Sequence, residues 1–225
     1  MRFFVKIDDD KDAGRAPLSR RLIIETAVTF ADTNGLEVLS MRKLGAELGV
    51  EAMSLYNHVE NKEDILNGMV DYVFQSISLP PVDLEWKEAL RQLATSLMDR
   101  FTTHAWTLSL KSSHTDMGPG MLIFLERLLA ILGDAGFSDE DAHHALQMLG
   151  SHASGYAFQQ ASSLEGPETE ALDLESMLAN LGDEFPNVAR MAPLLAECDF
   201  NTEYAFGLDI IIDGLAARLD ASRAG

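Results

Sequence analysis

The sequence has few basic residues, a single cysteine and no long hydrophobic run, and each shortage excludes a class of protein. Lysine and arginine total 17 against 36 acidic residues, and the net charge is −19. Taken alone, the overall charge therefore argues against a nucleic-acid partner. The lone cysteine, Cys198, excludes an internal disulfide and fits a reducing compartment. Because no apolar run reaches about 18 residues, we expect no membrane partner and a cytoplasmic location.

The acidic excess is concentrated in the later part of the sequence. Residues 1–78 carry 9 basic and 13 acidic side chains, whereas residues 79–225 carry 8 basic and 23 acidic. A basic edge in the first part can therefore still face phosphates while the acidic side chains face away. Residues 1–14 are too charged for a secretory signal.

Apolar residues recur at helical spacing along almost the whole sequence, and no segment alternates as a half-buried strand does. We therefore predict an all-α fold. Pro80 and Pro81 interrupt the pattern and mark a domain junction. The predicted parts are a flexible N-terminal arm at 1–16, a three-helix helix-turn-helix DNA-binding domain at 17–64, a connecting helix at 65–79, and a larger C-terminal helical domain for ligand binding and dimerisation at 80–225.

Individual helices follow from caps and breakers. The predicted ranges are 18–34, 41–48, 52–58, 62–77, a long helix capped by Asp83, a buried central helix around 121–132 that begins near Pro119, one from Ser138 to about 162, a short one after Pro186, and a last one at about 200–220. Residues 163–185 are expected to form a polar loop, with about one helical turn near 171–181.

Residues 36–66 are the most informative stretch. Ser40 can cap a helix by accepting a hydrogen bond from a backbone N–H of its first turn. Leu44 and Leu48 share one face of that helix, and Gly49 supplies the permissive backbone that ends it. The small residues that open the next helix are what the tip of a helix needs to enter a DNA major groove.

Two of the predicted helices, one that contains residues 142–157 and the last one at about 200–220, are rich in small residues. Both suit packing against other helices. Small side chains allow backbones to approach closely, and two copies of each helix would form a four-helix bundle. Packing within one subunit is the alternative. The predicted dimer interface consists of Ala145, Leu149, His152, Tyr156, Gly207, Ile210, Ile211, Gly214 and Ala217.

The later helices also hold more large apolar side chains than simple packing requires. Together with a few polar groups they suit a small apolar effector, although a plain core is the alternative. The candidate pocket residues are Phe101, His104, Trp106, His114, Met121, Phe124, Met148, Tyr156 and Gln159. No metalloprotease, hydrolase, zinc-binding or phosphate-loop motif is present, so we expect no enzyme activity, no cofactor and no metal site.

The segment SMRKLGAELGVEAMSLYNHVENKEDIL resembles the helix-turn-helix of the tetracycline-repressor (TetR) family of transcriptional regulators. The matching positions are Leu44, Leu48, Gly49, Val50, Leu55, Tyr56, His58, Lys62 and Glu63. More weakly, GDAGFSDEDA and FGLDIIIDGLAARL are similar to the C-terminal domain of the tetracycline repressor itself. The resemblance implies an all-helical homodimer that binds a double-stranded DNA operator through three N-terminal helices and an inducer through its body.

By position, the resemblance assigns Ala52, Met53, Ser54 and Asn57 to base contacts or groove lining. A place at the edge of the core is the alternative for Met53. The remaining DNA-binding candidates can donate hydrogen bonds to phosphate or to a guanine edge, or stand beside a helix start that attracts anions. They are Arg20, Arg21, Ser40, Arg42, Tyr56, His58 and Lys62. Ordinary solvated charge is the alternative for Arg20 and Arg21.

We therefore expect a ligand-responsive DNA-binding regulator, a repressor that an unidentified small-molecule effector releases from a palindromic operator. The tetracycline repressor binds a magnesium-bound drug through a histidine and a glutamate. Gln159 stands at the glutamate position, and His114 matches the histidine loosely. An amide is a poor magnesium ligand, so we expect a different effector. The rival hypothesis is a helical dimeric binding or scaffold protein that has lost its affinity for DNA.

Overall fold

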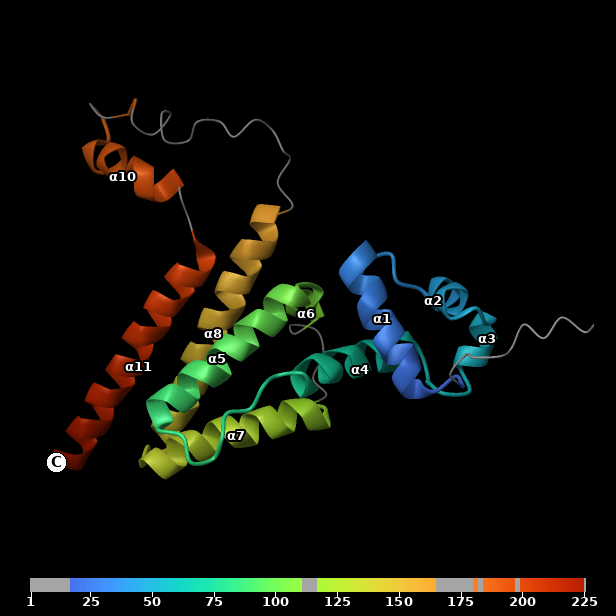
Figure 1. The fold of residues 1–225 in the computed structure, drawn as a ribbon, viewed down its shortest axis with the longest axis horizontal. Helices are drawn as coiled ribbons and strands as arrows, with labels where there is room; N and C mark the ends of the chain where they lie inside the picture. The colour runs from blue at the N-terminus through green and yellow to red at the C-terminus, as the bar shows by residue number, and fades with distance from the viewer. Residues whose placement is uncertain (1–16, 111–116, 165–179, 182–183, 197–198, 225) are drawn as a thin grey trace, which may run out of the picture.

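The computed structural model describes residues 17–110, 117–164, 180–181, 184–196 and 199–224. The predicted arm, His114, Cys198 and most of the 163–185 loop lie outside these residues. The predicted all-α class is confirmed, because the described residues form helices and connecting turns only (Figure 1). The helices are α1 (Arg20–Asn34), α2 (Met41–Leu48), α3 (Ala52–Leu55), α4 (Lys62–Gln75), α5 (Trp86–Thr103), α6 (Trp106–Leu110), α7 (Pro119–Ala135), α8 (Asp139–Leu164), α10 (Pro186–Ala196) and α11 (Phe200–Ala224).

Helices α1, α2 and α3 form a small head at one end of the molecule, and α11 lies at the opposite end (Figure 1). Ser19 and Ser40 cap α1 and α2 by accepting hydrogen bonds from Leu22 N and Lys43 N. The head has its own apolar core, made by one face of each of these helices and the first half of α4. Its most deeply buried members are Ile23, Ala27, Leu44, Leu55, Ile65 and Met69.

Helix α4 belongs to two cores. Ile65 and Met69 pack in the head, whereas Phe74 and the following Ile77 pack in the body. The Asp71 carboxylate accepts a hydrogen bond of 2.6 Å from the Gly120 N–H. That N–H lies in the first turn of α7, where a helix favours negative charge. Helix α4 is therefore fixed to the body at one end and to the head at the other.

The body packs α5, α7, α8 and α11 around a second apolar core. Ion pairs link neighbouring helices at its surface, from Arg91 on α5 to Asp209 on α11 and from Arg218 on α11 to Asp141 on α8. The Tyr204 phenol donates to the Ala94 carbonyl oxygen at 2.7 Å, and burial raises the pKa of this phenol above its ordinary value. Helix α10 lies apart from these helices (Figure 1).

Several local expectations were wrong. Helix α3 ends at Leu55 instead of near residue 58. Helix α5 is capped by Glu85, whose carboxylate accepts from Lys87 N and Glu88 N, and not by Asp83. Helix α6 was not predicted, because five residues are too few to show a helical period.

The central part of α7 is also less buried than predicted. Leu128, Ile131 and Leu132 lie in the core, but Leu122, Ile123 and Leu129 are exposed in the single chain. An apolar run that covers the whole circumference of a helix cannot reveal which side meets the core. The orientation of α7 is decided instead by its contacts with α4.

Leu132 and Leu129 provide a matched test of this packing on one helix. Leu132 is 0% exposed and Leu129 is 41% exposed. Replacing Leu132 by alanine should lower the free energy of unfolding by about 2–5 kcal/mol. The Leu129→Ala change should cost less than about 1 kcal/mol. Urea unfolding at equal protomer concentration measures both, and equal losses would contradict this placement of α7.

Candidate nucleic-acid interface and effector cavity

The turn between α2 and α3 holds the two helices in close contact. Gly49 adopts the left-handed conformation that ends α2, with φ 62° and ψ 35°. Gly45 lies where α2 meets the start of α3, and a Cβ atom there would stand 2.9 Å from the Val50 carbonyl oxygen. Leu48 and Leu55 complete the buried side. The position of α3 on the head is therefore fixed by backbone contact as well as by apolar packing.

The opposite side of α3 and its following turn face outwards. Met53 is 72% exposed, and Tyr56, Asn57 and His58 are exposed beside it. Ser54 is half-buried, as is Ala52, the first residue of the helix. Two hydrogen-bonding side chains, one phenol, one imidazole and one flexible apolar chain are thus presented together. The alternative that places Met53 at the edge of the core finds no support in this geometry.

The cations of the head divide into those with partners and those without. Arg20 Nη2 lies 2.7 Å from Asp64 Oδ1, Arg21 Nε lies 2.7 Å from Glu25 Oε1, and Lys62 Nζ donates to the Leu39 carbonyl oxygen at 2.7 Å. The contacts of Arg20 and Lys62 join separate segments of the head, whereas Arg21 pairs with a neighbour on its own helix. A phosphate would have to compete with the carboxylates for Arg20 and Arg21.

Arg42 and Lys43 are exposed in the first turn of α2, and neither side chain forms an ion pair with any residue in the described part of the chain. Arg42 was predicted from the sequence as a DNA-binding residue, whereas Lys43 was not. The signal was present, because consecutive residues at a helix start diverge by only about 100° and both can reach the same surface. Ser40, the third candidate here, is half-buried and engaged as the cap of α2.

A cavity of about 210 Å³ lies in the body between α4, α5, α7 and α8. Its walls are almost entirely apolar, and two polar side chains, Gln147 and Ser151, supply hydrogen-bonding groups. The lining residues are Phe74, Leu97, Phe101, Met121, Phe124, Leu125, Leu146, Gln147, Gly150 and Ser151. No charged side chain is among them, so the cavity suits a neutral aromatic or apolar molecule.

Three of the predicted pocket residues, Phe101, Met121 and Phe124, line this cavity, and the others described lie elsewhere. Met148 and Gln159 are exposed on α8. Tyr156 packs with its ring against Tyr204 and His152. Phe74, Gln147 and Ser151 were not predicted. The angles between the helices decide which residues of α4 and α8 face this cavity, and the sequence does not show these angles.

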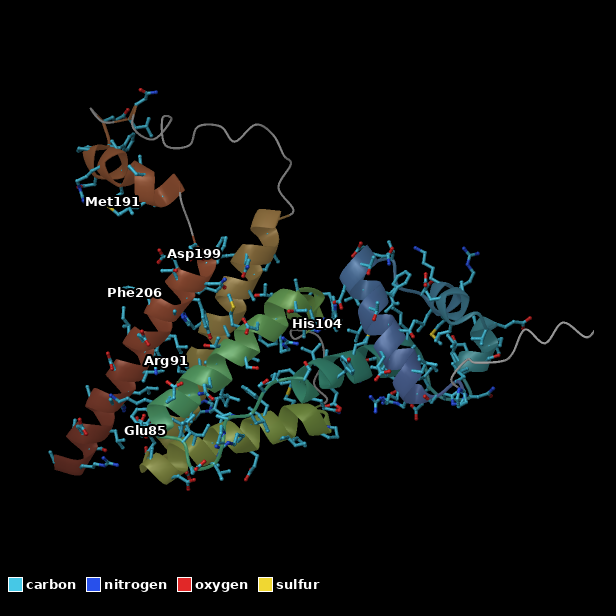
Figure 2. The ribbon with its side chains drawn as sticks, viewed as in Figure 1. Glu85, Arg91, His104, Met191, Asp199 and Phe206 are labelled. Carbon is cyan, nitrogen blue, oxygen red and sulfur yellow. The ribbon has the colours of Figure 1, made fainter. Side chains whose placement is uncertain are left out.

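His104 and Trp106, also predicted for the pocket, instead join the body to the head. Both approach the same oxygen of Asp32, which is on α1: His104 Nδ1 lies 2.9 Å from Asp32 Oδ1, and Trp106 Nε1 donates to it at 2.7 Å. The His104 side chain is buried at the end of α5 nearest to α1 (Figure 2). This contact is a second connection between head and body, in addition to α4.

Some of the predicted dimer residues are packed within the single chain, and others are exposed. Ala145 and Leu149 are buried within the single chain, and His152 stacks on Tyr204 and approaches its carbonyl oxygen at 2.9 Å. A Cβ on Gly207 would meet His152, so Gly207 serves packing between α8 and α11. On the outer side, Ile210, Gly214 and Ala217 are exposed on α11, with Phe206, labelled in Figure 2, one turn before Ile210. Tyr156 and Ile211 are half-buried.

Among the described residues, no group of three histidine, cysteine, aspartate or glutamate side chains is arranged to hold a metal ion. Likewise, no helix in the described ranges combines the length and apolar character needed to cross a membrane.

Comparison with known proteins gives consistent matches over nearly the whole chain. Residues 79–219 match the family model described as the tetracycline repressor-like C-terminal domain. The chain is 32% identical to the HTH-type transcriptional repressor DrrR1 of Streptomyces coeruleorubidus over 235 residues, covering 95% of this chain and 85% of that protein. It is 29% identical to the class E tetracycline repressor of Escherichia coli, with 92% and 95% covered.

Among solved structures, the Streptomyces coelicolor TetR family protein ActR in complex with actinorhodin superposes with a TM-score of 0.78. The sequence identity is 31%, and the match covers 91% of this chain and 99% of ActR. The structural match with ActR therefore extends over both the head and the body.

The ion pair between Arg20 and Asp64 gives a pH-dependent prediction. Partial burial alone would raise the pKa of Asp64, but hydrogen bonds from Arg20 and from the Glu60 N–H, with the charge of Arg20, lower it overall. A carboxylate with a lowered pKa stabilises the fold above its unfolded pKa of about 3.9, and this stabilisation is lost as the pH falls through the folded value. Arg20→Met should therefore raise the pKa of Asp64 and cost less than about 1 kcal/mol at pH 7.

A side-chain carboxyl NMR titration of Asp64 measures this change. Arg21→Met is the matched control, because Arg21 lies on the same helix but pairs with Glu25. An Asp64 pKa that responds equally to both changes would show that the ion pair is not its cause.

Proposed function

Because the chain belongs to the TetR family of transcriptional regulators, we propose that it is a repressor that binds a palindromic DNA operator as a homodimer and is released by a small-molecule effector. The observation that carries this proposal is the outward face of α3. Met53, Tyr56 and Asn57 are exposed there, while Leu55 on the other side is 0% exposed. A helix held this firmly by one side and open on the other can enter a major groove.

In this proposal residues 17–64 form the DNA-binding domain, 65–79 connect it to the body, and 80–225 form the regulatory and dimerisation domain. Ser54 and Asn57 read base edges, and Met53 and Ala52 contact apolar groups such as the thymine methyl. Arg42, Lys43, Tyr56 and His58 contact phosphates, which position the head without reading sequence. Arg20, Arg21 and Lys62 remain candidates for phosphate contacts, although Arg20 and Lys62 also join separate segments of the head.

Dimerisation would use the exposed stripe of α11 together with the outer face of α8. Ile210 is 58% exposed, and a Cβ on Gly214 or on Gly155 of α8 meets no atom within 4 Å. Close backbone approach by a second copy is therefore unobstructed at both glycines. Two heads on one dimer would contact half-sites about one DNA turn apart, which is what a palindromic operator offers.

Effector binding is proposed for the cavity of about 210 Å³ in the body. Phe74 of α4 forms part of its wall, and the same helix contributes Ile65 and Met69 to the head core. A molecule that fits only one position of Phe74 would bias the tilt of α4 and hence the spacing of the two heads. ActR, a similar protein, has been solved in complex with actinorhodin, which supports a small-molecule ligand for this chain.

The primary test is selection of bound sequences from random DNA, followed by gel-shift titration of the best sequence. We expect an inverted repeat with half-site centres about 10 base pairs apart. A correctly folded dimer that shifts no DNA at low salt would favour the rival function, a helical scaffold. A stable monomer in solution would contradict the proposed dimer.

Substitutions at the proposed phosphate contacts and at the proposed base contacts should have different effects on DNA binding. Arg42→Ala or Lys43→Ala should weaken binding to all sequences and reduce the salt slope by about 1. Ser54→Ala or Asn57→Ala should cost about 1–3 kcal/mol on the best site and relax base preference there. The exposed Arg190, on α10, is the charge-matched control, and its change to alanine should leave binding unaltered. Equal salt slopes for all variants would refute the phosphate role.

The cavity can be tested without knowing the natural effector, using 2-naphthol as a neutral aromatic probe whose hydroxyl can bond to Gln147 or Ser151. A Cβ on Gly150 meets no atom within 4 Å, so a leucine there can fill the cavity. Millimolar 2-naphthol should raise the Tm of the wild type and of Gly150→Ala by about 2–4 °C, which corresponds to about 1 kcal/mol. Gly150→Leu should abolish this rise. Stabilisation that persists in Gly150→Leu would place the probe elsewhere.

A further inference from the structure

A second and larger hollow lies between the head and the body. Its volume is about 590 Å³, within the range of small-molecule sites. One wall is the end of α1 and the loop after it, and the other is formed by the end of α5, α6 and the last turns of α8. The hollow shares no lining residue with the cavity of about 210 Å³ in the body, which we call the core cavity. It is therefore a separate site, and the proposed function does not use it.

The charge of this hollow has one sign. Asp32 and Glu37 are the charged side chains among its lining residues, and no cation of the described chain lines it. Asp32 Oδ1 is occupied by Trp106 and His104, whereas Oδ2 takes no hydrogen bond from the residues that the structure describes. Glu37 is exposed and extends its carboxylate over Gly35, 2.4 Å from where a Cβ on that glycine would be.

The remainder of the lining is apolar, aromatic or hydroxyl-bearing. The indole of Trp106 forms one side, and Phe158 on α8 faces the hollow although its side chain is 63% exposed to solvent. Thr103 and Ser109 add hydroxyl groups. Phe158 is a large aromatic ring exposed to water beside a concave surface. A flat apolar molecule that covers such a ring lowers the free energy of the system.

We propose that this hollow is a second ligand site, which takes a small molecule that carries a protonated amine on an aromatic ring system. The ammonium group pairs with the carboxylates of Glu37 and Asp32, and the ring system lies between Trp106 and Phe158. Aromatic faces attract cations as well as rings, so both halves of such a molecule are stabilised. An anionic ligand is excluded by the two carboxylates, in contrast to the uncharged core cavity.

A ligand bound in this hollow would weaken the contact that Asp32 makes between head and body. Asp32 is on α1 of the head, and its partners His104 and Trp106 are on the body. An ammonium group at Asp32 Oδ2 draws negative charge away from Oδ1 and so weakens the hydrogen bond that Oδ1 accepts from the indole N–H of Trp106. The amine ligand therefore weakens the second connection between head and body, the one made by Asp32. A ligand in the core cavity instead affects the first connection, helix α4.

The test uses the full chain labelled with nitrogen-15 on its two tryptophans, Trp86 and Trp106. The probes are 4-phenylbenzylamine and its neutral analogue 4-phenylbenzyl alcohol. We expect the amine to shift the indole N–H signal of Trp106 to saturation while Trp86, on α5 outside the hollow, stays unchanged. The alcohol should bind at least tenfold more weakly. This readout does not involve DNA, so it is independent of the proposed repressor function.

Glu37→Gln should raise the amine Kd at least tenfold. Asp83→Asn is the matched control, because this exposed residue changes the net charge equally but does not line the hollow. In Gly150→Leu, which fills the core cavity, the Trp106 shift should persist. The proposal is overturned by equal affinity for amine and alcohol, by equal Kd values in Glu37→Gln and Asp83→Asn, by a Trp106 signal that does not move at millimolar amine, or by loss of the shift in Gly150→Leu.

Discussion

The packing of α4 into two cores is the constraint on which the rest of the molecule depends. Met69 is 0% exposed in the head, and Phe74, five residues later, is buried in the body. Because an α-helix is stiff over this length, a displacement at Phe74 is carried to Met69 with little loss. Gly68 adds to this coupling, since a Cβ there would stand 2.5 Å from Ile24 of α1. Head and body therefore cannot reorient independently while both cores stay packed.

The second connection has a different chemical character. Asp32, His104 and Trp106 join head and body through polar contacts to a single carboxylate oxygen, and these can break without opening an apolar core. Apolar packing in α4 resists change until a ligand repacks the wall at Phe74. We propose that the two connections therefore respond to different molecules: a neutral molecule in the core cavity for the first, and a charged one for the second.

Local signals in the sequence were sufficient to predict the helix-turn-helix of the head. Ser40, Gly49 and the leucines of α2 each act within a few residues, so the helix-turn-helix could be predicted from spacing alone. The sites in the body depend on distant pairs. His104 lies 72 residues from Asp32 in the sequence, and nothing in the sequence around either residue predicts their contact. For the same reason the pocket prediction found Phe101 and Phe124 as large apolar side chains but missed the polar Gln147 and Ser151.

The acidic composition and a DNA-binding role are compatible once the partners of each charge are known. In the head, Asp64 and Glu25 are engaged with Arg20 and Arg21, and most of the acidic excess lies beyond residue 79. An acidic body is repelled by phosphates, so only the face of the head that carries α3 can approach DNA closely. Because few cations of the head are left for phosphates, we expect its non-specific affinity for DNA to be low. In the proposed function, specific binding would therefore depend on base contacts from α3 and on the pairing of two heads in one dimer.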